Sequence, residues 1–167
     1  AGVYGIPGVA ADTNRPGARV DSAGWADSRD QLWLFGGFGY GGATPGYLND
    51  LWKFDGTQWT WVSGESQADQ AGVYGIRKVA ADTNMPGGRC DSTSWKDSQG
   101  NLWLFGGWGY DGTGAFGCLN DLWKYDGARW TWIAGDSWAN QAGVYGTRGA
   151  AAGSNKPGAR VGAVSWI

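Results

Sequence analysis

Residues 32–37 read LWLFGG, and the same six residues return at positions 102–107. Each copy is followed by a second shared stretch, LNDLWKFDG at 48–56 and LNDLWKYDG at 119–127. The copies are separated by 102−32 = 70 residues for the first stretch and by 119−48 = 71 for the second. A long and nearly constant period is typical of repeat architectures, so the chain is predicted to consist of repeated units.

A third shared stretch, AGVYGI, opens the chain at Ala1 and returns at Ala71, and AGVYGT begins at Ala142. The opening of the repeat therefore occurs three times, whereas LWLFGG and LNDLW occur twice. Each complete repeat contains four short apolar segments bounded by turn residues, which favours strands over helices. These predicted strands cover residues 18–25, 32–35, 51–54 and 59–62 in the first repeat and 88–95, 102–105, 122–125 and 130–133 in the second.

Asp-Gly pairs at residues 55–56 and 126–127 separate the third and fourth predicted strands. Glycine adopts the positive φ that a tight hairpin turn requires. The second strand is large and apolar at every position, which indicates a central strand that is covered on both faces. Each repeat is therefore predicted to be a four-stranded antiparallel meander with a neighbouring sheet on each side.

An apolar strand followed by a diglycine, LND, a spaced aromatic residue and a Trp resembles the Kelch repeat. The resemblance implies an all-β fold, a β-propeller of four-stranded blades around a central axis, with two complete blades and the first strand of a third. The period exceeds the roughly 50 residues usual for Kelch, and the extra length is assigned to loops. Blade one then covers residues 18–63, blade two 88–134 and the first strand of a third blade 159–167, with long loops at 1–17, 64–87 and 135–158.

The alternating direction of the strands places the long connections on one face of such a fold. These connections are residues 36–49 and 107–120 within the repeats, and residues 63–87 and 134–158 between them. The opposite face carries only short turns. Binding residues usually lie in long loops on a rigid scaffold, so this long-loop face is the predicted functional face.

Several aromatic residues fall within these long connections. Trp108 stands opposite Phe38 in the repeat, and Trp138 stands opposite Gln67. Such side chains could stack on a sugar ring or anchor a protein partner, or they could pack the loops onto the blade below. The candidate ligand-binding residues are Trp108, Trp138, Tyr40, Tyr110, Tyr47, Phe116 and Phe38.

Arg19, Arg89 and Arg160 recur shortly after a Pro-Gly pair, at the start of each first strand. The Kelch resemblance implies that they lie close to the central axis. We expect each to pair with Asp21 or Asp91 or with a loop carbonyl, and an anion site in the central channel is the alternative.

Both cysteines, Cys90 and Cys118, lie in the second repeat, where the first repeat has Val20 and Tyr47. Two thiols that appear together in one repeat suggest a disulfide, and hence a secreted protein. Two unrelated reduced cysteines are the alternative.

No metal or other cofactor is expected, and catalysis is not expected either. The Asp-Thr-Asn triplets at residues 12–14 and 82–84 offer oxygen ligands but match no calcium-loop signature, so they are expected to cap turns. The chain has no His, which removes His-based zinc and copper sites and His-dependent nucleophilic sites. Galactose oxidase, a Kelch propeller, binds copper through His and Tyr, so this chain cannot reproduce that site.

The formal net charge of −2 and the lack of a basic stripe argue against nucleic acid as a partner. No apolar run is long enough to span a membrane. The chain opens at Ala1 without a visible signal peptide, which indicates a processed chain or an excerpt of a longer one. The predicted first strand of a third blade would need cover from further blades of the same chain or from other copies.

The expected function is therefore that of a non-catalytic Kelch-type module, secreted or at the cell surface, that binds a protein or glycan through the long-loop face. One alternative is a self-assembling structural protein that forms an extracellular fibre or ring. A second alternative is a fragment of a galactose oxidase-like or glycan-processing enzyme.

Overall fold

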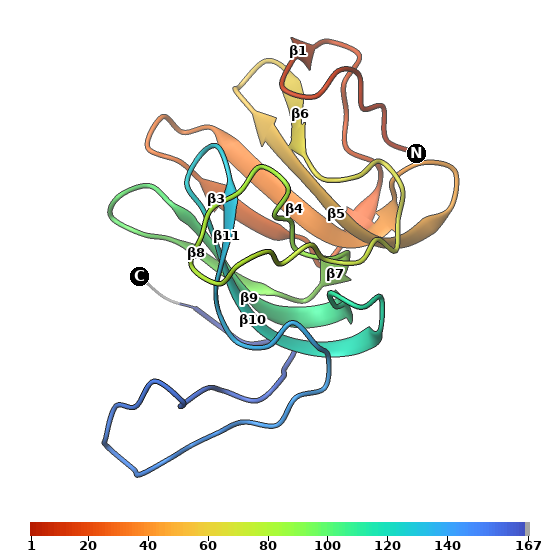
Figure 1. Cartoon of the computed structure of the whole chain (residues 1–167). Coiled ribbons are helices and arrows are strands. Elements are labelled where there is room, and N and C mark those ends of the chain that lie inside the picture. The colour runs from red at the N-terminus through yellow and green to blue at the C-terminus, as the bar shows by residue number, and fades with distance from the viewer. Residues whose placement is uncertain (166–167) are drawn as a thin grey trace.

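The computed structural model describes residues 1–165, which form eleven strands in two antiparallel sheets and no helix (Figure 1). Sheet 1 consists of β1 (Ala10–Ala11), β2 (Arg19–Val20), β3 (Ala23–Ala26), β4 (Leu32–Tyr40), β5 (Pro45–Phe54) and β6 (Trp59–Ser63). Sheet 2 consists of β7 (Arg89–Cys90), β8 (Thr93–Lys96), β9 (Leu102–Tyr110), β10 (Phe116–Tyr125) and β11 (Trp130–Ala134). The all-β prediction is confirmed. The propeller stays a prediction, because two sheets do not complete a ring of four to eight blades.

The strand order in sheet 1 is β1-β6-β5-β4-β2, with β3 also paired to β4. Sheet 2 has the order β11-β10-β9-β7, with β8 also paired to β9. The first strand of each predicted meander is therefore interrupted, and Asp21 and Asp91 lie at the interruptions with φ values of 55° and 53°. The other three strands of each repeat follow in the predicted order.

The second and third strands of each repeat are longer than predicted. In sheet 1 they continue as β4 and β5 to a short connection at residues 41–44, so residues 36–49 do not form the long loop expected for them. Gly36 and Gly37 take φ values of 63° and 97°, and the register shifts between Phe35 and Gly37. Glycine tolerates this bulge, which lets the strand continue past the diglycine. The same correction applies to residues 107–120 of sheet 2.

The two sheets stack face to face, and the seam between them is the hydrophobic core. Phe35 of sheet 1 packs on Trp130 of sheet 2, with ring centroids 5.3 Å apart. Trp25 donates a hydrogen bond from its indole N–H across the seam to the carbonyl oxygen of Trp95, at 3.0 Å. The buried core residues are Ala23, Trp25, Phe35 and Leu51 from sheet 1, and Tyr74, Leu102, Leu104, Trp123, Tyr125 and Trp130 from the second repeat.

The opening segment of each complete repeat also departs from the loop expected for it, because it folds back along the outer strand of its own sheet. Residues 1–17 place Ala10 opposite Thr60 of β6, and residues 71–87 form a bridge between Ala81 and Trp130. The hairpin in the first of these segments is closed by a bridge between Val3 and Arg15. These segments therefore extend the outer edge of each sheet.

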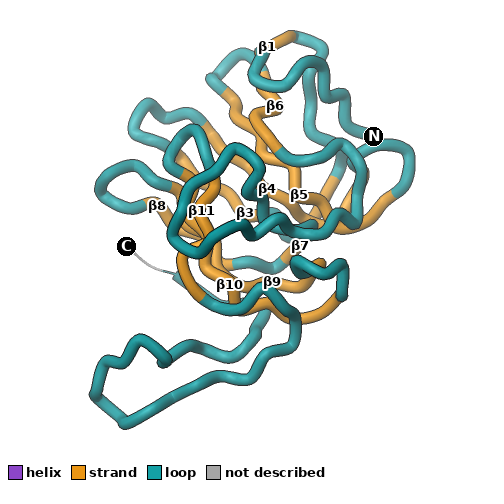
Figure 2. The backbone as a smooth tube through the Cα atoms, in the orientation of Figure 1, coloured by secondary structure: helices purple, strands orange, loops and turns teal. Residues whose placement is uncertain are grey.

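The third repeat behaves differently. Residues 142–158 form a similar hairpin, bridged between Val144 and Lys156, but it projects away from both sheets, and Figure 2 shows it as loop. Residues 159–165 form no strand, although the Arg160 N–H bonds to the Leu119 carbonyl at 2.9 Å. The rest of the predicted strand 159–167, including Trp166, lies outside the described residues.

No helix that could cross a membrane occurs within residues 1–165.

Candidate functional site

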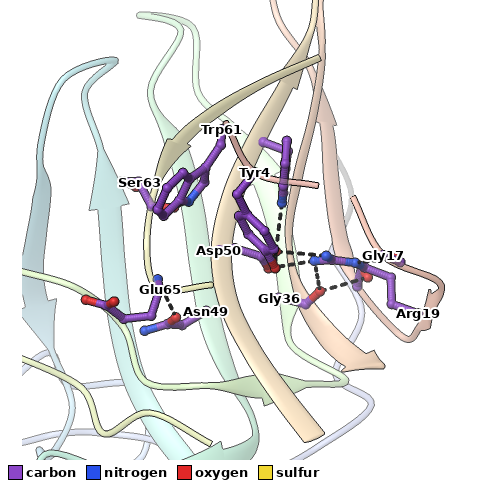
Figure 3. Close-up of polar contacts among 11 residues, drawn as sticks. Tyr4, Gly17, Arg19, Gly36, Asn49, Asp50, Trp61, Ser63 and Glu65 are labelled. Carbon is purple, nitrogen blue, oxygen red and sulfur yellow. Dashed lines mark hydrogen bonds and ion pairs between the residues drawn. The ribbon is translucent and has the colours of Figure 1, made fainter. Parts of the chain in front are cut away.

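Each sheet contains one buried ion pair between the arginine of its first strand and the aspartate of LND. In sheet 1, Arg19 Nη1 lies 2.6 Å from Asp50 Oδ1, and Arg19 Nη2 lies 2.8 Å from Asp50 Oδ2 (Figure 3). In sheet 2, the corresponding distances between Arg89 and Asp121 are 2.7 and 2.8 Å. Paired, parallel hydrogen bonds of this kind are among the stronger ones in proteins.

The same carboxylate receives two further donors. The Tyr4 hydroxyl and the Trp52 indole N–H each donate to Asp50 Oδ2 at 2.7 Å. Tyr74 and Trp123 do the same for the aspartate of sheet 2, at 2.6 and 2.7 Å. Burial and the neighbouring carboxylate raise the pKa of both tyrosines well above its usual range, so both hydroxyls remain donors. The opening segment is thereby attached to the centre of its sheet.

The arginine contacts differ in one respect from the expectation. Arg19 donates to the carbonyl oxygen of Gly17 at 3.0 Å, which is the kind of loop contact expected, and to that of Gly36 on β4, also at 3.0 Å. The carboxylate partner is Asp50 rather than Asp21, and the Arg19 side chain reaches it across β4, which lies between β2 and β5. The guanidinium groups of Arg19 and Arg89 thus donate their hydrogen bonds to oxygens of the protein itself, so we assign both residues a role in stabilising the fold.

The aromatic candidates come together at the end of the seam where β4 meets β5 and β9 meets β10. Tyr47 stands at the centre, with its ring centroid 5.1 Å from Phe38, 4.7 Å from Phe116 and 6.2 Å from Tyr110. Phe116 in turn packs on Tyr110 at 5.1 Å and on Trp108 at 5.3 Å. We call these five residues, Phe38, Tyr47, Trp108, Tyr110 and Phe116, the aromatic cluster. It crosses the seam, because two members come from sheet 1 and three from sheet 2.

The aromatic cluster lies partly at the surface. Phe38 is 41% exposed and Phe116 is 39% exposed, while the other three members are half-buried. Two further candidates, Tyr40 and Trp138, are exposed, and within residues 1–165 neither ring packs against another aromatic ring. The structure therefore joins five of the seven candidates into one surface and leaves the other two outside it.

The inter-repeat connections line the aromatic cluster with polar groups. The Asp69 carboxylate accepts a hydrogen bond from the Tyr47 backbone N–H at 2.9 Å, and the Asp69 N–H donates to the Tyr47 carbonyl at 2.7 Å. Asn140 makes the equivalent pair of contacts with Cys118, at 3.0 and 2.7 Å. Residues 64–70 and 135–141 therefore lie beside the aromatic strands, on the face where the sequence places long connections.

The expected disulfide between Cys90 and Cys118 is not formed. Cys90 of β7 pairs with Trp108 of β9 on one side, and Cys118 of β10 pairs with Trp108 on the other. The two cysteines are thus separated by two strand spacings, about 9.6 Å, whereas a disulfide needs α-carbons within about 7 Å. Burial and the nearby Asp91 and Asp21 raise the pKa of the Cys90 thiol to about 11, so it is a poor nucleophile at neutral pH.

The asparagines of the two Asp-Thr-Asn triplets hold the outer hairpins in place. Asn14 Nδ2 donates to the carbonyl oxygens of Val9 at 2.9 Å and Trp59 at 3.1 Å. Asn84 makes the same two contacts with Val79 and Trp130. Each amide therefore closes its own turn and joins that turn to the outer strand.

Sequence reasoning missed the aspartate of LND and the tyrosine of AGVYG as the partners of the arginines. The signal was present, because each repeat has the tyrosine 15 positions before the arginine and the aspartate 31 or 32 positions after it. Compared with models of protein families and with curated proteins, the sequence matches none.

Proposed function

We propose that this chain is a non-catalytic, Kelch-type binding module that engages a protein or glycan through the aromatic cluster. The observation that carries the proposal is the packing of five aromatic side chains from two sheets into one partly exposed surface. Singly exposed apolar residues are ordinary on a protein surface, whereas grouped aromatic residues are typical of recognition sites.

The surroundings of the aromatic cluster suit recognition. Its members lie on paired strands, so little side-chain or backbone freedom is lost when a partner binds. Aromatic rings offer a large apolar area together with, in Tyr47, Tyr110 and Trp108, a polar group at the edge. Asp69 and Asn140 add carboxylate and amide groups beside the rings. A sugar ring that stacks on an aromatic face, or an apolar side chain of a protein, fits this combination.

The polar groups elsewhere in the core favour binding over catalysis. The Asp50 and Asp121 carboxylates are buried, and each accepts hydrogen bonds from an arginine, a tyrosine and a tryptophan. The Cys90 thiol is held in its protonated form by its raised pKa. The proposal includes an extracellular or cell-surface location, although Cys90 and Cys118 form no disulfide.

The test begins with a glycan array and an affinity screen with immobilised protein, followed by titration of the partner they return. Phe116→Ala and Phe38→Ala are each expected to weaken binding by about tenfold or more, the loss typical of a central aromatic contact. The matched control is Ile76→Ala, because Ile76 is 71% exposed on the outer hairpin of the second repeat, outside the cluster. The proposal fails if neither screen returns a partner, or if both cluster variants bind as tightly as the control.

A further inference from the structure

The third-repeat segment, defined as residues 142–165, carries the side chains that anchor the openings of the first two repeats, but here they are exposed. Tyr145 is 74% exposed, whereas its counterpart Tyr74 is 7% exposed. Arg160 is exposed as well, whereas Arg89 is 1% exposed. The segment thus presents the parts of a binding interface without the surface that they fit.

The contacts missing from this segment can be named by comparison with the first repeat. Arg160 Nε donates to the Gly158 carbonyl at 3.0 Å, as Arg19 does to Gly17, but its guanidinium contacts no carboxylate within residues 1–165. Asn155 Nδ2 bonds to the Ala150 carbonyl of its own turn at 3.0 Å, whereas Asn14 also bonds to the Trp59 carbonyl of an outer strand. Figure 1 shows the corresponding hairpin, in blue, extending away from both sheets.

These unmet contacts define the chemistry of the partner. It must supply the aspartate of an LND stretch for Arg160 and Tyr145, and the carbonyl of a Trp on an outer strand for Asn155. Within residues 1–165 both features occur together in each sheet, at Asp50 with Trp59 and at Asp121 with Trp130.

Sheet 2 also has a face, beside the third-repeat segment, that no other sheet of residues 1–165 covers. Thr93, Trp95, Phe105 and Leu122 line a cavity of about 430 Å³ together with Arg160. Their counterparts in sheet 1 are the core residues Ala23, Trp25, Phe35 and Leu51, which sheet 2 covers at the seam. Leu51 is fully buried there, whereas Leu122 is half-buried.

On sheet 1, the matching face is not covered by any other sheet of the part of the chain that the structure describes. Leu32 is 50% exposed, while its counterpart Leu102 in the seam is 3% exposed. Phe54 and Trp59 are half-buried, whereas the corresponding Tyr125 and Trp130 are almost completely buried. The molecule therefore presents both halves of its own seam, one on each outer side.

We propose that copies of this chain associate head to tail, with sheet 2 of one copy stacked on sheet 1 of the next. The third-repeat segment of the first copy then replaces residues 1–24 of the second copy on β4, β5 and β6. Arg160 and Tyr145 bind the Asp50 carboxylate of the second copy, and Asn155 binds its Trp59 carbonyl. The new seam continues the one that already exists within the chain, and this proposal does not depend on the proposed ligand.

Exchange is required because the two equivalent segments would occupy the same space. The third-repeat segment is already attached to sheet 2, since the Gly107 N–H bonds to the Arg160 carbonyl at 3.0 Å and the Gly162 N–H bonds to the Asp91 carbonyl at 3.2 Å. Gly162 of the third-repeat segment has a φ of 62°, and Asp21, its counterpart in the displaced segment, has a φ of 55°. This left-handed backbone conformation is less strained for glycine than for aspartate. A head-to-tail contact of this kind closes into a ring or extends into a filament.

Sedimentation velocity over a range of concentrations tests the association. Wild-type protein is expected to shift from monomer to larger species as its concentration rises. The double variant Y145A/R160A is expected to stay monomeric with an unchanged unfolding midpoint, because both side chains are exposed in the monomer. Arg148→Ala, an exposed residue of the same hairpin, is the matched control and should associate like the wild type. A wild-type chain that is monomeric throughout, or a double variant that associates equally well, would overturn the proposal.

Hydrogen exchange distinguishes segment exchange from simple stacking of the faces. In the associated form, the amides of residues 142–158 should exchange more slowly than in the monomer, and those of residues 1–17 should exchange faster. If the protein associates while residues 1–17 keep their monomer protection, the exchange of segments is wrong.

Discussion

Arg89 Nη1 lies 2.7 Å from Asp121 Oδ1, and neither side chain has any exposed surface. Arg160 stands at the same position of the next repeat, is exposed, and lacks a carboxylate partner within residues 1–165. One residue type therefore occurs at one repeat position in two opposite environments. This contrast allows the contribution of the buried pair to be measured against a control within the chain.

Replacing Arg89 by Ala should lower the free energy of unfolding by about 3–5 kcal/mol, because the Asp121 carboxylate would remain buried without its countercharge. Arg160→Ala should change it by less than about 0.5 kcal/mol in the monomer, as is usual for exposed positions. Urea unfolding followed by tryptophan fluorescence, at a concentration where the protein is monomeric, measures both. Equal losses for the two variants would show that the ion pair contributes nothing specific.

The seam offers a second matched pair, since Leu102 is 3% exposed and Leu32, its counterpart, is 50% exposed. Leu102→Ala should lower the free energy of unfolding by about 2–5 kcal/mol, because it leaves a cavity between the sheets. Leu32→Ala should cost less than about 1 kcal/mol, in keeping with its partial exposure. Chemical denaturation of the two variants tests the stacking of the sheets, and a larger loss for Leu32→Ala would contradict it.

The Asp55 carboxylate accepts hydrogen bonds from the backbone N–H groups of Gln58 and Thr57 and from the Thr57 hydroxyl, and these lower its pKa from 3.8 to about 2. A pKa that is lower in the folded state means that the ionised group stabilises the fold above about pH 4, and that this contribution is lost as the pH falls toward about 2. Asp55→Asn should therefore reduce the dependence of stability on pH in this window. An NMR titration of the Asp55 carboxyl that gives an ordinary pKa would contradict the turn geometry.

Both thiols should be free. The denatured protein should react with two equivalents of a thiol reagent without prior reduction, because Cys90 and Cys118 flank β9 and do not meet. In the native protein, Cys90 should react more slowly than an exposed thiol at neutral pH, because its pKa is raised to about 11 and the thiol stays in the unreactive protonated form well below that pH. If the denatured, non-reduced protein had no reactive thiols, the result would show that Cys90 and Cys118 form a disulfide after all.

The strands and tight turns could be predicted because their determinants are local. LWLF at residues 32–35 lies within β4, and Gly56 and Gly127 take the positive φ values, 99° and 95°, expected at the hairpin turns. The diglycine was misleading, since Gly36 and Gly37 look like the start of a loop but form a bulge within a longer strand. The aromatic candidates Phe38, Tyr40 and Tyr47 consequently lie on strands rather than in loops.

The parts that sequence reasoning missed depend on contacts between distant residues. Arg19 and Asp50 are separated by 31 positions, so nothing local distinguishes Asp50 from the other aspartates of the chain. The cysteines were misjudged for a related reason, because only the register of three strands shows that Trp108 lies between them. The aromatic candidates could be named from their repeat positions, but their meeting across the seam required the stacking of the two sheets.

The most direct test of the proposed binding site is hydroxyl-radical footprinting of the protein, free and bound to the partner returned by the screens. Binding through the aromatic cluster should reduce the modification of Phe38 and Phe116, while the exposed Ile76 on the outer hairpin should be modified equally in both states. Protection confined to other surfaces, with Phe38 and Phe116 modified as in the free protein, would contradict the assignment of the aromatic cluster as the binding site.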